Sequence, residues 1–116
     1  MHVLNNQLNI SFQLMVSTSK GTHFFDPSDI IRLEASSNYT CIYFSNRLPL
    51  IIAKILGNYE DVLAGYGFVR IHRSHLVNKN FVSFVDRAGN IFMKDDSRVE
   101  ISRRKRKQVI ELLRVA

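Results

Sequence analysis

The stretch YTCIYFS, residues 39–45, decides the class of fold. β-Branched and aromatic side chains fill this stretch, and every second residue falls on the same face, with Thr40, Ile42 and Phe44 on one side. A period of two with these residue types is typical of a β-strand, in which successive side chains point to opposite faces. We therefore predict a strand over residues 39–45.

Segments of the same kind recur along the chain and predict a mostly-β fold. Gly, Pro, Asn and Asp residues separate them and mark the turns. Pro49 has no backbone N–H to donate, which places its strand at the edge of a sheet. The further strands that we expect are Phe12–Thr18, Thr22–Phe25, Ile30–Ala35, Leu48–Ile52, Phe68–Ile71, Phe81–Val85, Ile91–Lys94 and Val99–Ile101.

Two short helices are expected in addition to the strands. Apolar residues recur at helical spacing within residues 53–64 and again within residues 103–113, which predicts one amphipathic helix over each range. Gly65 ends the first helix. Ser102 is a good N-cap for the second, because its hydroxyl can accept a hydrogen bond from a free N–H group of the first turn.

The length and composition fit one globular domain. The chain has 116 residues, of which 46% are hydrophobic. We expect residues 1–7 to be a disordered lead or the remnant of a linker, and residues 8–116 to form the domain. The longest apolar run, residues 48–53, is far too short to span a bilayer. The single cysteine, Cys41, fits the reducing conditions of the cytoplasm.

Positive charge is concentrated in the second half of the chain. Residues 1–66 carry four Lys/Arg and five Asp/Glu, whereas residues 67–116 carry twelve Lys/Arg and five Asp/Glu. The second half therefore holds a net charge of +7, and the whole chain one of +6. This asymmetry predicts a basic surface and an acidic partner, such as nucleic acid or anionic lipid.

Five consecutive cations, residues 103–107, stand at the start of the predicted C-terminal helix. The helix dipole places partial positive charge there, so the cations repel it. An external anion such as phosphate would relieve this repulsion by binding the free N–H groups. A solvated basic face is the simpler alternative, and the run alone does not decide between the two.

Three polar segments interrupt the predicted scaffold, at residues 35–40, 70–78 and 102–107. Each lies beside the end of a strand and is rich in side chains that form hydrogen bonds. Polar loops on a rigid β scaffold commonly carry function. We therefore take these three segments as the candidate site.

The stretch FVRIHRSHLVN, residues 68–78, closely resembles the signature of LytTR-type DNA-binding domains, the output modules of many bacterial LytR/AgrA-type response regulators. Two further blocks resemble the same family: DIIRLEA at residues 29–35 followed by Asn38 and Tyr39, and VEISRR at residues 99–104. Order and spacing agree over roughly residues 10–114. The first block is specific, whereas the other two alone would be weak.

The resemblance implies a fold and a mode of binding. The fold is an elongated, mostly antiparallel, multi-sheet β domain with one or two short helices. It binds double-stranded DNA by pushing loops, rather than a recognition helix, into successive major grooves. The implied contacts fall at or next to Thr40, at Arg73 and at Arg104, one in each polar segment. Some members carry a histidine near position 40, so this chain departs from them and a different base preference is implied.

The resemblance also implies a biological setting. The domain would regulate bacterial transcription, as the effector part of a two-component response regulator or as a stand-alone regulator. Its partner would be double-stranded DNA with paired direct repeats, bound by two copies or a homodimer. An upstream receiver domain or a histidine kinase would be further partners.

The candidate DNA-binding residues are Asn38, Tyr39, Thr40, His72, Arg73, Ser74, Arg103, Arg104, Lys105 and Lys107. Arg73 is the strongest, since arginine reads guanine with two hydrogen bonds and also clamps phosphate; a surface ion pair is the alternative. The cations beside Arg104 contact phosphates or face solvent. Glu34 is a partner for either Arg32 or Arg70.

Several of these residues also have structural interpretations. Asn38 can read adenine or form a turn, and Tyr39 can lie along the DNA backbone or belong to the core. His72 can donate to a phosphate or form a hydrogen bond within its loop. Ser74 and Asn78 are expected to satisfy backbone groups at the loop ends.

We expect no enzyme, metal site or cofactor. Cys41 with His72 or His75 is the nucleophile pairing that the sequence offers, but no third, orienting group is evident and Cys41 is expected to be buried. His72 and His75 lie three residues apart without a cysteine at ligand spacing. One remaining alternative is a membrane-surface or protein-interaction module that uses the basic helix. Another is an RNA-binding module, which is disfavoured because the sequence shows no evident aromatic stacking platform.

Overall fold

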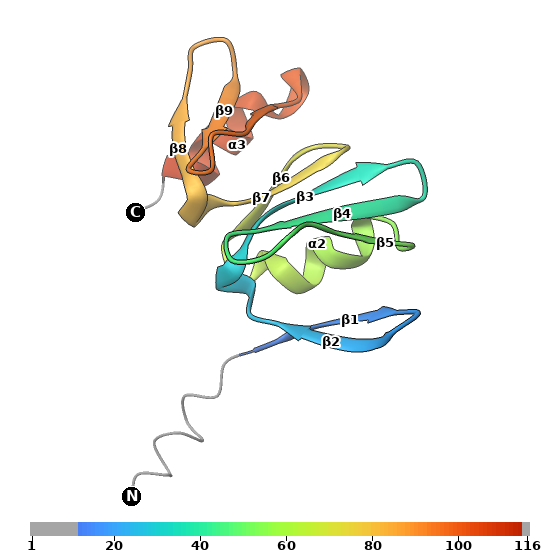
Figure 1. Ribbon diagram of the computed structural model, residues 1–116. Helices are drawn as coiled ribbons and strands as arrows, with labels where there is room; N and C mark the ends of the chain where they lie inside the picture. The colour runs from blue at the N-terminus through green and yellow to red at the C-terminus, as the bar shows by residue number, and fades with distance from the viewer. Residues whose placement is uncertain (1–11, 115–116) are drawn as a thin grey trace, which may run out of the picture.

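The computed structural model describes residues 12–114, which form three antiparallel β-sheets and two α-helices (Figure 1). The principal dimensions of 50 × 35 × 24 Å make the domain elongated. The mostly-β, antiparallel, multi-sheet prediction is therefore confirmed. The predicted lead at residues 1–7 lies outside the described residues.

The central sheet has five strands in the order β5-β4-β3-β7-β6. Two hairpins, β3–β4 and β6–β7, lie side by side because β3 also pairs with β7. The edge strand β5 pairs with β4 alone among the described strands, which agrees with Pro49 just before it. The bounds are β3 Ile30–Ser36, β4 Tyr39–Phe44, β5 Leu50–Ile52, β6 Phe68–His72 and β7 His75–Asn78.

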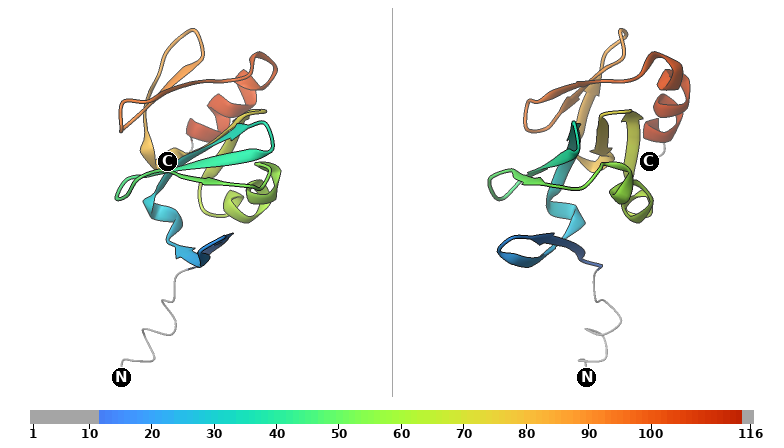
Figure 2. Two further views of the ribbon diagram at one scale, coloured as in Figure 1. Left: turned by 45° about the vertical axis from the view of Figure 1, so that its right-hand side comes forward. Right: turned by 90° about the vertical axis from the view of Figure 1, so that its right-hand side faces the viewer.

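Smaller elements cover the two faces of the central sheet. The hairpin of β1 (Leu14–Thr18) and β2 (Gly21–Phe25) and the helix α2 (Gly57–Ala64) lie at one end, and a second sheet with α3 (Arg106–Arg114) lies at the other (Figures 1 and 2). The second sheet comprises β8 (Val82–Val85), β9 (Asn90–Met93) and β10 (Arg98–Glu100). Short 3₁₀ turns, η1 Pro27–Asp29, η2 Lys79–Phe81 and η3 Arg103–Lys105, connect them.

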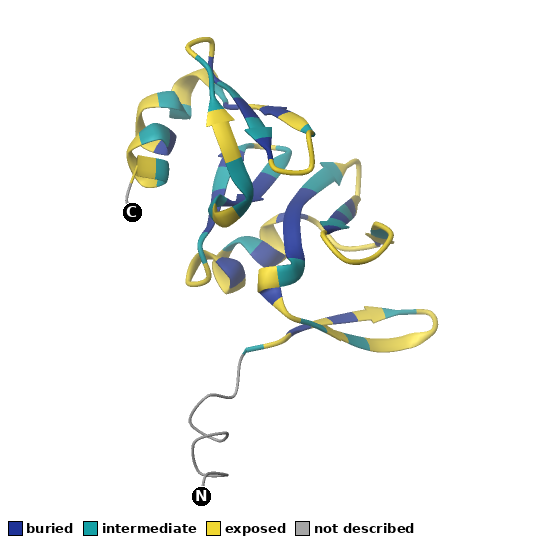
Figure 3. Ribbon diagram, turned by 60° about the vertical axis from the view of Figure 1, so that its left-hand side comes forward, coloured by how far each residue is buried: buried dark blue, intermediate teal, exposed yellow. Residues whose placement is uncertain are grey.

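The central sheet separates two hydrophobic cores, which explains why β3 and β7 are buried on both faces (Figure 3). Leu33 and Leu76 point toward α2 and the β1–β2 hairpin, into the first core. Ile31 and Val77 point toward the second sheet and α3, into the second core. Because side chains alternate along a strand, each inner strand supplies both cores and holds the hairpin tips in fixed relative positions.

Residues 70–78 are not a polar loop, contrary to the sequence interpretation. They form the end of β6, a two-residue turn at Arg73–Ser74, and β7. Leu76 and Val77 of β7 are fully buried, so this half of the segment belongs to an inner strand of the sheet. Asn78 has the expected structural role, because its Nδ2 donates to the carbonyl of Ile30 at 2.9 Å.

Two further expectations need correction. Ser102 stands at the N-cap position, but its side chain makes no capping hydrogen bond, and a 3₁₀ turn precedes α3. Its backbone N–H instead donates to the carbonyl of Ile71 at 2.8 Å and ties η3 to β6. Cys41 is half-buried rather than buried, because Thr40, Ile42 and Phe44 occupy the inner face of β4.

Gly89 is the glycine whose replacement should cost most. It has a φ of +90°, and an added Cβ would lie 2.7 Å from Arg106 Nε. We expect Gly89→Ala to lower the free energy of unfolding by more than about 1 kcal/mol, measured by urea denaturation. Gly65→Ala is the matched control, because no heavy atom lies within 4 Å and its φ is −72°. Equal effects of the two substitutions would contradict this account of Gly89.

Candidate nucleic-acid interface

The three candidate segments lie along one edge of the molecule. The β3–β4 tip, the β6–β7 tip and η3 all point to the same side in Figure 1, and this side faces the viewer in the right panel of Figure 2. We call residues 37–39, 72–74 and 102–108 the loop edge. Two of its segments also share a groove of about 530 Å³, lined by His72, Arg73, Ser102, Arg104, Lys105 and Gln108. Gln108 was not among the predicted site residues.

Arg70 holds the β6–β7 turn in place. Its Nε donates to the carbonyl of His72 at 2.8 Å, and its Nη2 donates to the carbonyl of Arg73 at 2.5 Å. Its Nη1 donates to Glu60 Oε1 of α2 at 2.6 Å. The guanidinium therefore fixes the backbone of Arg73, whose own side chain is exposed. Glu34 pairs with Arg32 at 2.7 Å, which decides between its two candidate partners.

His72 has the structural hydrogen bond that the sequence left open. Its Nδ1 accepts a hydrogen bond from the Ser74 backbone N–H at 3.0 Å. The neutral ring therefore carries its proton on Nε2, a donor that remains for a ligand in the groove. The carbonyl of Ser74 accepts from the N–H of Ala35 at 2.9 Å, and this bond joins the turn to the end of β3.

The β3–β4 tip presents two of its three predicted residues. Asn38 lies in the two-residue turn and is exposed, and Tyr39 is 51% exposed, so Tyr39 is not part of the core. Thr40 is fully buried, and its hydroxyl donates to the carbonyl of Lys54 at 2.6 Å. The alternation of β4 turns Thr40 inward. Thr40 therefore supports the tip from inside, and we drop it from the candidate DNA contacts.

The cations of residues 103–107 do not all have the same surroundings. Arg103, Arg104 and Lys107 are exposed and Lys105 is half-buried. Arg106 turns away, and its Nη2 donates to the carbonyl of Ala88 at 2.6 Å. Within residues 12–114, no carboxylate forms an ion pair with Arg73 or with the four other candidate cations of the loop edge. Their charges are therefore available to an external anion.

His75 lies opposite His72 in the hairpin register, and its Nδ1 is buried without a hydrogen-bond partner. Burial lowers the pKa of His75 below 6.5; His72 and Arg32 lower it further, while Glu34 and Glu100 oppose the shift. The unfolded chain then binds the proton at a higher pH than the folded domain does. We expect stability to fall as the pH drops from 6.5 toward the lower folded pKa.

Thermal unfolding of the wild-type protein and of His75→Gln at pH 7.5 and at lower pH would test this expectation. The variant should lose less stability on acidification than the wild type. An identical loss in both proteins would contradict a role of His75.

The loop edge offers hydrogen-bond donors and positive charge rather than groups for bond-breaking chemistry. Among residues 12–114, no three His, Cys, Asp or Glu side chains gather in a way that could hold a metal ion. No helix in that range is long and apolar enough to cross a membrane. Such donors on a rigid β scaffold suit the recognition of a polyanion, and they define a β-scaffold nucleic-acid-binding domain.

Comparison with known families agrees with this class. The model of the LytTr DNA-binding domain family matches residues 20–114, and the chain belongs to this family. The solved LytTr DNA-binding domain of a protein described as a methyl-accepting/DNA response regulator from Bacillus cereus has the same fold, with a TM-score of 0.75. It is 24% identical, and the alignment covers 91% of this chain and 100% of that one. A search of curated proteins finds no match.

Membership of this family supports DNA binding and transcription regulation as the role of the chain. The family is a DNA-binding one, not a catalytic one. Sequence reasoning identified the loop edge through its polar segments but missed the ion pair of Arg70 with Glu60 and its role in holding the turn. Arg70 sits between apolar neighbours in a strand, a weak signal for a structural role, and no local pattern links it to Glu60 ten residues earlier.

Proposed function

We propose that the domain binds double-stranded DNA sequence-specifically and regulates bacterial transcription, with the loop edge inserted into successive major grooves. Arg73 and Arg104 read base edges, and Asn38 reads a base from the β3–β4 tip, at the other end of the loop edge. Tyr39 lies along the sugar–phosphate backbone. His72 donates from Nε2, and Ser74 lies beside it in the turn. Arg103, Lys105 and Lys107 contact phosphates and position the protein.

One observation carries this proposal: Arg104 and Lys105 of η3 and Arg73 of the β6–β7 turn, none of which forms an ion pair among the described residues, share a single groove. The backbone bond from Ser102 to Ile71 and the two bonds from Arg70 hold that groove in shape. Preorganised donors bind an anion without having to order a loop first. Side chains in fixed positions are also what base readout requires.

A lipid-binding role finds less support in the packing of α3. Val109 is fully buried and Ile110 and Leu113 pack against the second core. Most of the apolar residues of the helix are therefore occupied, with Leu112 the exposed one at 46%, and an amphipathic helix binds a membrane through its apolar face.

The proposal includes a setting. The domain acts in the cytoplasm as the effector of a two-component response regulator or as a stand-alone regulator, with a receiver domain or a histidine kinase as partner. Two copies occupy paired direct repeats on one face of the duplex. No cofactor takes part, and the domain has no catalytic activity of its own.

Selection from a random pool of duplex DNA tests the proposal. We expect a recovered motif, and the selected duplex should bind roughly a thousandfold more tightly than a scrambled one. Both affinities should fall steeply with salt. If the two duplexes bound equally and binding were lost at modest salt, the loop edge would be only a general polyanion-binding surface. Binding to anionic vesicles without duplex binding would favour a membrane-surface role.

A further inference from the structure

Two lysines in the first half of the chain remain outside the interface described so far. Residues 1–66 contain four Lys/Arg. Arg32 pairs with Glu34 and lies 4.0 Å from the centre of the Tyr43 ring, so it is part of the structure. Arg47 lies over the rings of Phe25 and Phe44. The other two, Lys20 and Lys54, are exposed.

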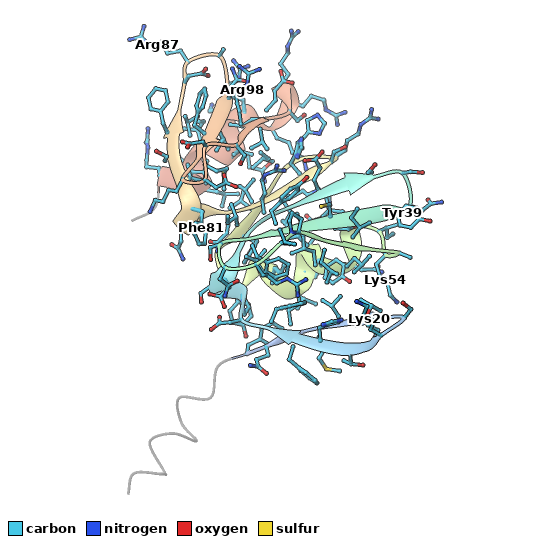
Figure 4. The ribbon with its side chains drawn as sticks, in the orientation of Figure 1. Lys20, Tyr39, Lys54, Phe81, Arg87 and Arg98 are labelled. Carbon is cyan, nitrogen blue, oxygen red and sulfur yellow. The ribbon has the colours of Figure 1, made fainter. Side chains whose placement is uncertain are left out.

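Lys54 lines a cleft, and Lys20 directly follows Ser19, which lines the same cleft. The cleft has a volume of about 450 Å³ and is lined by three hydroxyl-bearing residues of the β1–β2 tip, by Tyr39 and Lys54, and by the apolar residues Ile51, Ile52 and Ala53. No carboxylate lines it among the described residues. Figure 4 shows Tyr39, Lys54 and Lys20 one below the other at the same side of the molecule. We call this feature the hairpin cleft.

The backbone at both lysines is held in place while the side chains remain free. Lys20 belongs to the two-residue turn between β1 and β2, and its N–H donates to Thr18 Oγ1 at 3.2 Å. A further hydrogen bond joins Thr18 Oγ1 to His23 Nε2 at 3.0 Å. The carbonyl of Lys54 accepts the bond from Thr40. The charges therefore stand on a fixed frame, as the cations of the loop edge do.

The hairpin cleft continues the line of the loop edge. From top to bottom in Figure 1 the order is η3, the β6–β7 tip, the β3–β4 tip and the β1–β2 tip. Tyr39 belongs to the loop edge and also lines the cleft, so the two surfaces meet at this residue. A duplex carries one negative charge per roughly 1.7 Å of its axis, so any duplex that follows this line brings phosphates to the cleft.

We propose that the hairpin cleft binds the phosphate backbone of DNA that flanks the recognised base pairs, through Lys20, Lys54 and the hydroxyls of the β1–β2 tip. This inference rests on the proposed function. In this proposal the β1–β2 hairpin lengthens the stretch of DNA that the domain contacts, and it does not read bases. A lysine ammonium suits this role, because it contacts a phosphate as a point charge.

Binding of two duplexes by the double variant Lys20→Ala, Lys54→Ala tests the proposal. One duplex contains only the selected base pairs, and the other adds flanking DNA on both sides. On the long duplex we expect about tenfold weaker binding at low salt and a salt slope smaller in magnitude by about two. Binding to the short duplex should not change. Lys94→Ala is the matched control, since Lys94 is an exposed cation next to Ser45, at the opposite end of β4.

Unchanged affinity and salt slope on the long duplex would overturn the proposal. So would an equal loss on both duplexes, because the lysines would then act on the core site. Absence of duplex binding by the wild-type protein would refute the proposed function as well, which separates the two failures. Thermal unfolding of the double variant confirms that it is folded.

Discussion

Replacement of Arg73 by alanine is expected to weaken binding to the selected duplex by about 1–3 kcal/mol, roughly a fivefold to 150-fold loss of affinity. Binding to a scrambled duplex should weaken much less. The reason is the position of the side chain: the carbonyl of Arg73 is held by Arg70, while its own guanidinium is exposed in the groove beside η3. Equilibrium titrations at one salt concentration, with both duplexes, measure the difference.

The controls for Arg73 separate base readout from general charge. Arg73→Lys keeps the charge but loses the planar fork that pairs with guanine, so it should retain non-specific affinity and lose most of the discrimination. Arg87→Ala removes an exposed arginine from another hairpin tip, away from the loop edge in Figure 4, and should leave discrimination unchanged. Equal losses on both duplexes for Arg73→Ala would assign this side chain to a phosphate.

Replacement of Arg70 by methionine should lower both stability and DNA affinity. The substitution removes three hydrogen bonds of 2.5–2.8 Å from a partly buried site and leaves the carbonyls of His72 and Arg73 without this donor. We expect a loss of about 1–3 kcal/mol in the free energy of unfolding. DNA affinity should also fall at temperatures where the variant is folded, because the β6–β7 turn loses its anchor.

Glu60→Gln is the conservative control for Arg70→Met. An amide oxygen still accepts a hydrogen bond from Arg70, and the Glu60 side chain is 42% exposed, so the loss of its charge costs little. The turn should keep its shape, and DNA affinity should stay near that of the wild type. If Arg70→Met melted like the wild type and bound the selected duplex as tightly, Arg70 would not position the turn.

Sequence patterns located most strands through β-branched and aromatic residues between turn signals, and most clearly where a strand exposes one face. The alternation of residues 39–45 reports one buried and one more exposed face, and the structure has a strand there. The strand β7 was missed for the opposite reason. Leu76, Val77 and Asn78 are buried consecutively between two cores, so no alternation remains to be read.

The candidate site was predictable as a set of segments but not as a set of contacts. The run of five cations can be read directly from the sequence. The hydrogen bond from Arg106 to the carbonyl of Ala88, which turns this one cation away from the site, depends on where the β8–β9 turn lies in the fold. Thr40 and Tyr39 are neighbours in the same predicted segment, but they fall on opposite faces of β4, so Tyr39 is exposed and Thr40 is buried. The β1–β2 tip next to Lys20 and the residue Lys54 meet at one cleft only because the β1–β2 hairpin packs against the sheet.

Amide chemical shifts recorded by NMR during titration with the selected duplex test the central claim most directly. Our account predicts the largest changes at residues 37–39, 72–74 and 102–108, with smaller ones at the β1–β2 tip. The β4–β5 connection and η1, at the other side of the central sheet, should change little. Large changes confined to that other side, with the loop edge unaffected, would contradict the assignment of the loop edge as the DNA-binding surface.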